Sequence, residues 1–377
     1  MTEINILTTF LLSFTTLYIF SALYLLIQRH PKIVKNSKKY RISVLLAVRN
    51  EEKYLNKCLQ ALANQDYNTS LYDVFILDDN SNDNSAAIAK DFCGSHHNFH
   101  YMLIKEQQSG LKGKMNVLAQ GLIGQNCDLV LITDADCLVP PSWINGITAY
   151  FDENTGLVGA LTSLTPLPNM NLTYKENLFH RIQALDWLFL QAVARFSSNA
   201  GKPLTVLGNN FAFSLKAYRE TGGFEKIGFS ITEDYALLKA IEKTGRWKIK
   251  HINDPQAVIF SYPLDSLKDF FLQRLRWIKG GRSARPWAYF LMTTSFLTHF
   301  LLLITLITNP GNIFNLLSLI SIFLMDYQTV KSNIKKIKSD QLKPFFILFE
   351  LFYMIYTLLF SLYFLFPLKI GWKGRKL

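Results

Sequence analysis

Residues 129 to 136 have the sequence Leu129-Val130-Leu131-Ile132-Thr133-Asp134-Ala135-Asp136. Four apolar residues suited to a buried strand lead directly into two carboxylates that are one residue apart. In an extended strand the side chains of residues i and i+2 point the same way, so Asp134 and Asp136 can share one ligand. A hard divalent cation that carries phosphate oxygens is the natural candidate for that ligand. The competing interpretation is that both acids are turn or capping residues.

Strands and helices alternate around this stretch. Strands are predicted at residues 42–48, 74–77, 101–104 and 129–132, with helices at 51–64, 85–92 and 115–122 between them. This order predicts parallel βαβ units, whose ligands bind at the carboxyl ends of the strands. Farther along, the pattern predicts strands at 158–164 and 211–214 and helices at 174–196 and 235–243. The predicted class is therefore α/β.

A second acidic strand end lies at Asp78 and Asp79, followed by Asn, Ser and Asp residues. Such residues make turns and cap helices, which explains Ser81, Asn82 or Asp83. Two consecutive carboxylates before the turn are less well explained in this way. One of them can accept hydrogen bonds from the base or ribose of a nucleoside.

Three further segments carry polar groups suited to a ligand. Residues 109–114 form a basic, glycine-containing loop that opens a helix and is suited to a diphosphate, although they lack the spacing of a P-loop. Gly208 permits a close approach of the backbone to a ligand, and a bulge is the equal alternative. Thr232-Glu233-Asp234 precedes a helix, so capping by Thr232, with the acids favoured by the helix dipole, competes with a catalytic role.

Residues 269–279 are predicted to form an amphipathic helix at the membrane surface. Gln273, Arg276 and Trp277 share one face at helical spacing, while Phe270, Phe271, Leu275 and Ile278 are expected to meet lipid. The simple interpretation is that Arg and Trp anchor the helix at the level of the headgroups.

The remaining apolar residues predict membrane helices. The chain has 377 residues, of which 49% are hydrophobic, and residues 4–27 contain no charge and are long enough to cross a bilayer. Three later apolar runs cover residues 287–308, 313–325 and 345–366, of which the second is short for a span. Four complete spans would place the basic residues 369–377 outside the cell, against the positive-inside rule. We therefore expect one of the last three runs to be re-entrant or interfacial.

The net charge of +12 does not indicate nucleic acid. Basic residues cluster directly after the first span and between the later ones, as the positive-inside rule and contact with anionic lipid require. The four cysteines have no CxxC spacing and are expected to be free thiols.

Taken together, these residues resemble the family-2 glycosyltransferases, in particular the membrane branch with the synthases of poly-N-acetylglucosamine, hyaluronan, cellulose and chitin and the ceramide glucosyltransferases. The resemblance covers about residues 40 to 285, and the order and spacing of its motifs make it specific. The motifs are Val48-Arg49-Asn50-Glu51-Glu52, Asp78-Asp79, Gly113-Lys114, Asp134-Ala135-Asp136, Thr232-Glu233-Asp234 and Gln273-Arg274-Leu275-Arg276-Trp277.

The resemblance implies a GT-A-like fold and assigns a role to each motif. Asp136 and Asp134 would hold a diphosphate-bound Mg²⁺ or Mn²⁺, with Asp136 as the first choice for the metal. Asp234 would be the base of an inverting transfer, with Glu233 beside it. The nucleotide-sugar would contact Asp78, Asp79, Lys114, Arg49, Asp134 and Arg276. Gln273, Arg276 and Trp277 would close over the diphosphate and the acceptor.

The expected reaction is the transfer of a hexosyl group from a nucleotide-sugar to a lipid acceptor in the membrane. The resemblance favours a UDP-sugar as the donor. The alternative is a processive synthase that extends a β-linked polysaccharide, and the small number of spans favours the lipid. A non-catalytic nucleotide-sugar-binding scaffold is disfavoured because the acids and Arg276 are all present. A metal-dependent phosphohydrolase is disfavoured because no histidine lies near the motifs.

The expected organisation is an N-terminal transmembrane helix at 1–28, a cytoplasmic GT-A domain at 40–265, an amphipathic helix at 266–286, a membrane region of two or three spans at 287–368 and a basic tail at 369–377. We expect an integral protein of the bacterial inner membrane. The sequence identifies neither the sugar nor a partner subunit.

Overall fold

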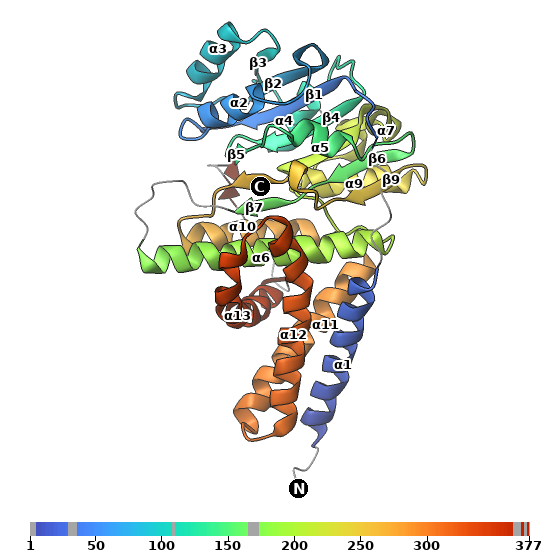
Figure 1. Cartoon of the computed structure of the whole chain (residues 1–377), viewed down its shortest axis with the longest axis vertical. Coiled ribbons are helices and arrows are strands. Elements are labelled where there is room, and N and C mark those ends of the chain that lie inside the picture. The colour runs from blue at the N-terminus through green and yellow to red at the C-terminus, as the bar shows by residue number, and fades with distance from the viewer. Residues whose placement is uncertain are drawn as a thin grey trace. The chain divides into compact units, whose positions relative to one another are not determined.

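The computed structural model describes residues 5–28, 36–107, 110–164 and 173–364, together with the backbone of 371–372 and 375–376. The chain divides into two compact units (Figure 1). The α/β unit comprises His30–Leu167 and Thr205–Tyr262, and the helical unit comprises Met1–Arg29, Pro168–Leu204 and Pro263–Leu377.

The α/β unit contains a seven-stranded sheet with the order β3-β2-β1-β4-β8-β6-β9. Strand β1 is parallel to β2 and β4, whereas β8 is antiparallel to both β4 and β6, so the sheet is mixed, as a GT-A-like fold requires. Its strands are β1 (Ile42–Val48), β2 (Tyr72–Asp78), β3 (Phe99–Leu103), β4 (Leu129–Asp134), β6 (Thr155–Gly159), β8 (Asn210–Ser214) and β9 (Lys248–His251). A second sheet has the order β5-β10-β7, with β5 (Cys137–Leu138), β10 (Ile259–Ser261) and β7 (Thr162–Leu164).

Helices cover both faces of the large sheet. Along β1, Val44 and Leu46 belong to one apolar cluster and Leu45 belongs to the other, as the period of two in a strand requires. The first cluster includes residues of α2 (Leu55–Ala63), α3 (Ser85–Ser95) and α5 (Trp143–Thr148), and the second includes residues of α4 (Gly113–Gly121), α7 (Leu215–Glu220), α8 (Gly223–Ile227) and α9 (Glu233–Lys243). Burial on both faces explains why the central strands are continuously apolar.

The structure differs from the predicted elements where the chain changes sheets. The strand predicted at 158–164 is two strands, because Ala160 and Leu161 carry the chain from β6 in the large sheet to β7 in the small one. Both of these residues are buried, so hydropathy alone shows no break. Strand β9 was not predicted because it lies at the sheet edge, where lysines on either side of Ile249 hide the apolar signal.

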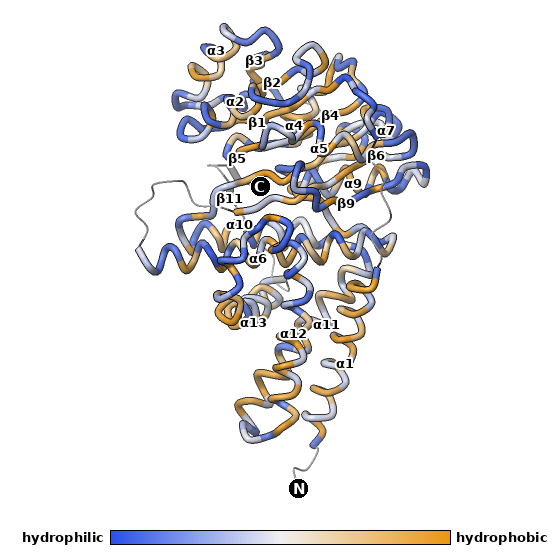
Figure 2. Tube along the Cα trace, in the orientation of Figure 1, coloured by the Kyte–Doolittle hydropathy of each residue, from blue (hydrophilic) through white to orange (hydrophobic). Residues whose placement is uncertain are grey.

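The helical unit contains the apolar helices. Its long elements are α1 (Ile6–Leu26), α6 (Tyr174–Asn199), α10 (Leu267–Gly281), α11 (Pro286–Thr308), α12 (Ile313–Lys336) and α13 (Phe346–Phe364). Among the described residues, four segments are long and apolar enough to cross a membrane: α1, α11, α12 and Asp340–Tyr363. Apolar residues dominate along them (Figure 2), and this indicates an integral membrane protein.

Two features of the helical unit differ from the expected organisation. Helix α12 continues well beyond residue 325, so it is long enough for a span. Residues 168–204 group with the apolar helices rather than with the α/β unit, because α6 packs against α12 and α13. At the C-terminus, the described backbone of Gly371–Trp372 pairs with that of Arg375–Lys376, within the predicted basic tail.

Helix α10 is held to α6 by a buried ion pair between Arg274 and Asp186. The Arg274 guanidinium also lies 4.0 Å from the ring centroid of Trp277 and 4.4 Å from that of Phe270. Burial raises the pKa of Asp186, although the positive charge of Arg274 opposes that effect. Breaking a buried pair leaves an uncompensated charge, so this contact fixes how α10 packs on α6.

The expectation that Phe270 and Phe271 meet lipid is wrong for Phe270, which is buried. Its ring packs against Phe179 of α6 and against α13, while Phe271 packs against Phe360 and Tyr363 of α13. Protein side chains therefore contact the apolar face of α10 at Phe270 and Phe271.

We predict that Arg274→Met destabilises the protein by about 3–5 kcal/mol, because Asp186 then stays buried without its partner. The measurement is the thermal unfolding midpoint of the full chain in detergent. Arg276→Met, two residues away on the same helix, is the matched control and should leave the midpoint nearly unchanged. Equal midpoints for the two variants would contradict the assigned role, and Asp186→Leu combined with Arg274→Met should restore most of the loss.

Candidate functional site

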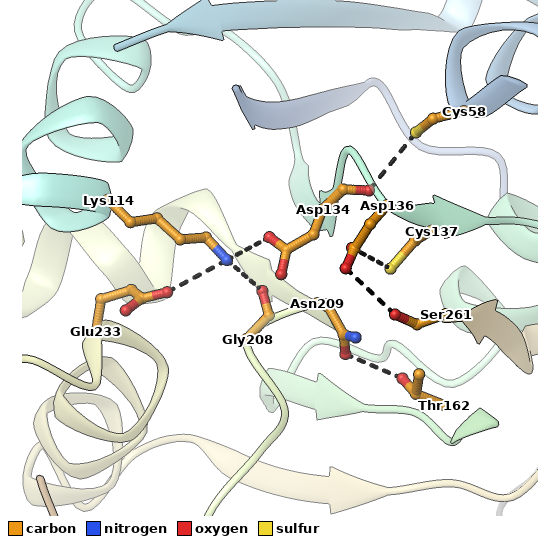
Figure 3. Close-up of polar contacts among 10 residues, drawn as sticks. All are labelled: Cys58, Lys114, Asp134, Asp136, Cys137, Thr162, Gly208, Asn209, Glu233 and Ser261. Carbon is orange, nitrogen blue, oxygen red and sulfur yellow. Dashed lines mark hydrogen bonds and ion pairs between the residues drawn. The ribbon is translucent and has the colours of Figure 1, made fainter. Parts of the chain in front are cut away.

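The two aspartates of the opening stretch lie at the end of β4, as predicted, but a turn separates them. Strand β4 ends at Asp134, Ala135 and Asp136 form the turn, and β5 begins at Cys137 in the other sheet. Ala135 is buried while both aspartates are partly exposed. The side chains of Asp134 and Asp136 lie near each other (Figure 3). The turn, and not an extended strand, produces this arrangement.

Lys114, in the first turn of α4, lies at the centre of the site (Figure 3). Its ammonium group is 2.5 Å from Oδ1 of Asp134 and 3.3 Å from Oε1 of Glu233. It also donates a hydrogen bond of 2.9 Å to the carbonyl oxygen of Gly208. The ammonium therefore has an acceptor for each of its three N–H groups and joins β4, α9 and the segment before β8.

The charge of Lys114 is held firmly. Burial alone would lower the pKa of this lysine, but the nearby charges of Asp134, Glu233 and Asp234 outweigh burial and raise the pKa above its ordinary value. Lys114 is consequently positive at any physiological pH. Three carboxylates surround this single ammonium, so the cluster retains a negative charge that favours a further cation.

Gly208 allows the two acids of α9 to approach the backbone before β8. A Cβ at this position would lie 3.1 Å from Oδ2 of Asp234 and 3.3 Å from Oε1 of Glu233, closer than ordinary van der Waals contact. The Asp234 carboxylate also accepts a hydrogen bond of 2.7 Å from the Tyr235 amide. Thr232 is the N-cap residue by position but makes no side-chain capping bond, whereas Glu233 and Asp234 both lie in the first turn of α9, where the helix dipole favours acids.

Asp136 lies beside Ser261 and Cys137. Oδ2 of Asp136 is 3.5 Å from the Ser261 hydroxyl, and Oδ1 is 3.5 Å from the Cys137 sulfur. The contact with the Ser261 hydroxyl is long for a hydrogen bond between two oxygens. All four cysteines are free thiols, as predicted, and burial raises the pKa of both Cys58 and Cys137 beside the site. The oxygen donors of Asp134 and Asp136 therefore fit a hard divalent cation, while the neighbouring thiols stay protonated.

At the second acidic strand end, Asp78 and Asp79 make different contacts. The buried Asp78 accepts a hydrogen bond of 2.9 Å from the Ser81 amide and one of 2.8 Å from the Tyr101 hydroxyl. Burial and this bond to Asp78 raise the pKa of Tyr101 to about 12, so the hydroxyl remains a donor. Asp78 thus closes the turn, whereas Asp79 forms an ion pair of 3.4 Å with Arg49 at the end of β1.

The residues expected from α10 lie in the helical unit. Gln273 accepts a hydrogen bond of 2.8 Å from Arg274, and Trp277 packs against both Arg274 and Trp187. Arg276 lies on the same helix and is partly exposed. The roles predicted for Gln273, Arg276 and Trp277 at the nucleotide-sugar remain predictions.

Sequence reasoning missed the polar residues that support the site. Asn209 accepts a hydrogen bond of 3.0 Å from Thr162, and the buried Asn210 binds Trp143 and two backbone carbonyls. Ser261 was missed because β10 has only three residues. The doublet Asn209-Asn210 after a glycine was the available signal, since two adjacent amides suit positions that must satisfy several buried groups.

Comparison with known proteins identifies relatives of this chain. The family model described as glycosyl transferase family 21 matches residues 12–377. A poly-β-1,6-N-acetyl-D-glucosamine synthase of Staphylococcus epidermidis is 26% identical over 247 residues, which cover 64% of this chain and 54% of that protein. A probable glycosyltransferase of Bacillus subtilis is 25% identical over 263 residues, covering 69% and 60%. The matched region thus spans little more than half the length of these relatives.

The fold also matches a solved structure. A mannosyltransferase from Pyrobaculum calidifontis, solved in complex with GDP-Man and Mn²⁺, has a TM-score of 0.59 and 16% identity. The match covers 92% of this chain and 98% of that one. At this identity the likeness concerns the fold, and it agrees with the GT-A-like α/β architecture predicted from the sequence.

We predict that Gly208→Ala lowers the release of nucleoside diphosphate from a nucleotide-sugar by about tenfold or more, because a small displacement of side chains that line a reaction site is costly. The new methyl group would push the carboxylates of Asp234 and Glu233 away from the backbone. Gly94→Ala is the matched control, since a Cβ there would meet nothing within 4 Å. If Gly208→Ala kept both its turnover and its unfolding midpoint, the reaction would not depend on the space that Gly208 leaves for the two carboxylates.

Proposed function

The chain belongs to glycosyl transferase family 21, and from that membership we propose that it extends a β-linked polysaccharide at the membrane, with a nucleotide-sugar as the donor. The observation that carries the choice of acceptor is the similarity to poly-β-1,6-N-acetyl-D-glucosamine synthases. The lipid acceptor expected from the sequence is less well supported. Its main argument was the number of spans, which limits how wide a channel one chain can enclose but does not select the acceptor.

The chemistry proposed for the α/β unit is a transfer with inversion. Asp234 takes the proton of the acceptor hydroxyl while the sugar leaves its diphosphate. The bond from the Tyr235 amide orients this carboxylate, and Gly208 leaves room for it. Lys114 keeps Glu233 and Asp134 in fixed positions beside it. These contacts support the assignment of Asp234 as the base.

The donor set of the site supports a divalent cation. Asp136 and Asp134 would hold Mg²⁺ or Mn²⁺, which prefer carboxylate oxygens. When bound, the ion supplies positive charge that stabilises the departing diphosphate. Asp79 and Arg49 would contact the nucleoside at the adjoining strand ends, whereas Asp78, with both oxygens bonded, would shape that turn. We further propose that Gln273, Arg276 and Trp277 act on the diphosphate and the acceptor.

The location proposed for this enzyme is the bacterial inner membrane, with the α/β unit in the cytoplasm. Nucleotide-sugars are made in the cytoplasm, and the basic residues beside the apolar helices support the same orientation through the positive-inside rule.

We predict that Asp234→Asn lowers release of nucleoside diphosphate by about 10²–10⁴-fold, since general-base catalysis contributes that much. The assay offers the detergent-purified full chain a panel of UDP- and GDP-sugars with Mg²⁺ or Mn²⁺. Asp91→Asn, an exposed aspartate on α3, is the control for loss of a carboxylate. Activity of Asp234→Asn equal to that of Asp91→Asn would disprove the role of Asp234.

The acceptor requires a separate measurement. We expect radiolabelled sugar to appear in a product of many sugar units that glycosidase digests, and chelation of the divalent cation should abolish it. A product of one sugar on an extractable lipid would overturn the polysaccharide proposal and restore the lipid acceptor. Turnover without either product would show hydrolysis and would contradict both.

A further inference from the structure

The helical unit contains a cluster of ionisable side chains that the proposed function does not use. His299 lies on α11, Asp326 on α12 and Glu350 on α13, in three of the segments that could span a membrane. The exposed fractions of these residues are 1%, 1% and 6%. One ligand atom from each residue lies within 4.8 Å of the other two. Ionisable groups are costly inside a membrane bundle, so a buried group of three calls for a physical explanation.

The hydrogen bonds of His299 determine which of its nitrogens faces the cluster. Nδ1 lies 2.7 Å from the carbonyl oxygen of Ser295, and a carbonyl can only accept, so Nδ1 carries the proton. In the neutral ring Nε2 is therefore unprotonated and carries a lone pair. It has no hydrogen-bond partner and lies 4.0 Å from Oε1 of Glu350.

The carboxylates present acceptors to the same point. Oδ2 of Asp326 and Oε2 of Glu350 are buried and have no hydrogen-bond partner. The other oxygen of Asp326 accepts a hydrogen bond of 2.6 Å from the hydroxyl of Tyr18 on α1. A nitrogen lone pair and two carboxyl groups thus converge, and their negative charge must be neutralised either by a shared proton or by a bound cation.

From these contacts we propose that His299, Asp326 and Glu350 bind a transition-metal dication, Zn²⁺ in the first place, inside the membrane bundle. Two negative charges would be neutralised by the ion, so the bundle would bury no net charge. Imidazole with carboxylates suits Zn²⁺, whereas Mg²⁺ and Ca²⁺ prefer oxygen ligands alone.

The surroundings have the features of a built metal site. Metal-binding histidines usually donate their other N–H to a carbonyl or carboxylate, and metal-binding carboxylates are themselves hydrogen-bonded. The Ser295 carbonyl and the Tyr18 hydroxyl supply these two bonds. Bonds of about 2.0–2.2 Å in tetrahedral geometry place the ligand atoms of Zn²⁺ about 3.3–3.6 Å apart, so the side chains must close by about 1 Å on the ion.

The test is the metal content of the full chain, purified in detergent, equilibrated with Zn²⁺ and passed over a desalting column. We expect about one tightly held Zn²⁺ per chain, determined by elemental analysis, and about tenfold or greater loss of affinity in His299→Gln or Glu350→Gln. Asp136→Asn, which removes a ligand of the proposed nucleotide-sugar site, should retain the ion. This control separates the present proposal from the proposed function.

A second measurement uses only the wild-type chain, in case the variants do not fold. Removal of the ion with a strong chelator should lower the unfolding midpoint, and Zn²⁺ but not Mg²⁺ should restore it, because the ion binds the folded state. The proposal would be overturned if the wild-type chain retained no Zn²⁺, or if Asp136→Asn lost the ion while His299→Gln and Glu350→Gln kept it. In that event shared protons must join the three side chains.

Discussion

The α/β unit depends on the contacts of a single ammonium group. Lys114 reaches from α4 to the end of β4, to the start of α9 and to the backbone before β8, which are four segments well separated in the sequence. Each segment ends or begins at the same edge of the sheet, because β4 is parallel to β1 and the neighbouring strand β8 is antiparallel to β4. The site is therefore a product of the topology, and Lys114 holds its acids at fixed positions after the strands have brought them together.

Much of this arrangement could be predicted from the sequence, because continuous apolar strands followed by Asp, Asn or Gly mark strand ends in α/β proteins. Asp134 and Asp136 were selected in this way, whereas Glu233 and Asp234 were selected from the motif before a helix and from the family resemblance. What the pattern did not show was the function of individual contacts. Lys114 was expected on a diphosphate and contacts Asp134 and Glu233, and Asp78 has one carboxylate oxygen bonded by Ser81 in its own turn and the other by Tyr101 on β3. Such distinctions depend on which donors the fold brings close, and spacing along a chain does not encode that.

The helical unit shows the same limit for a different reason. Hydropathy identifies an apolar helix, but it does not distinguish a lipid-facing side from one that another helix covers. Arg276 was singled out from the sequence, yet Arg274, two residues earlier, is the arginine that is buried against Asp186. Likewise His299 and Glu350 are isolated residues within apolar runs and Asp326 directly follows one, and only the packing of α11, α12 and α13 brings them together.

The division of the chain into two units has a consequence for how the molecule is made. The helical unit takes residues 1–29, 168–204 and 263–377, so the ribosome produces α6 before β8, α9, β9 and β10 exist. When α6 has just been made, the large sheet still lacks β8 and β9. Strand β4 then has no antiparallel neighbour, because β8 has not yet been synthesised. The α/β unit is complete once residue 262 has been made, whereas the helical unit still lacks residues 263–377 at that moment. The α/β unit can therefore fold while α6 still lacks its partners α12 and α13, and any continuous fragment that contains the whole α/β unit also contains α6.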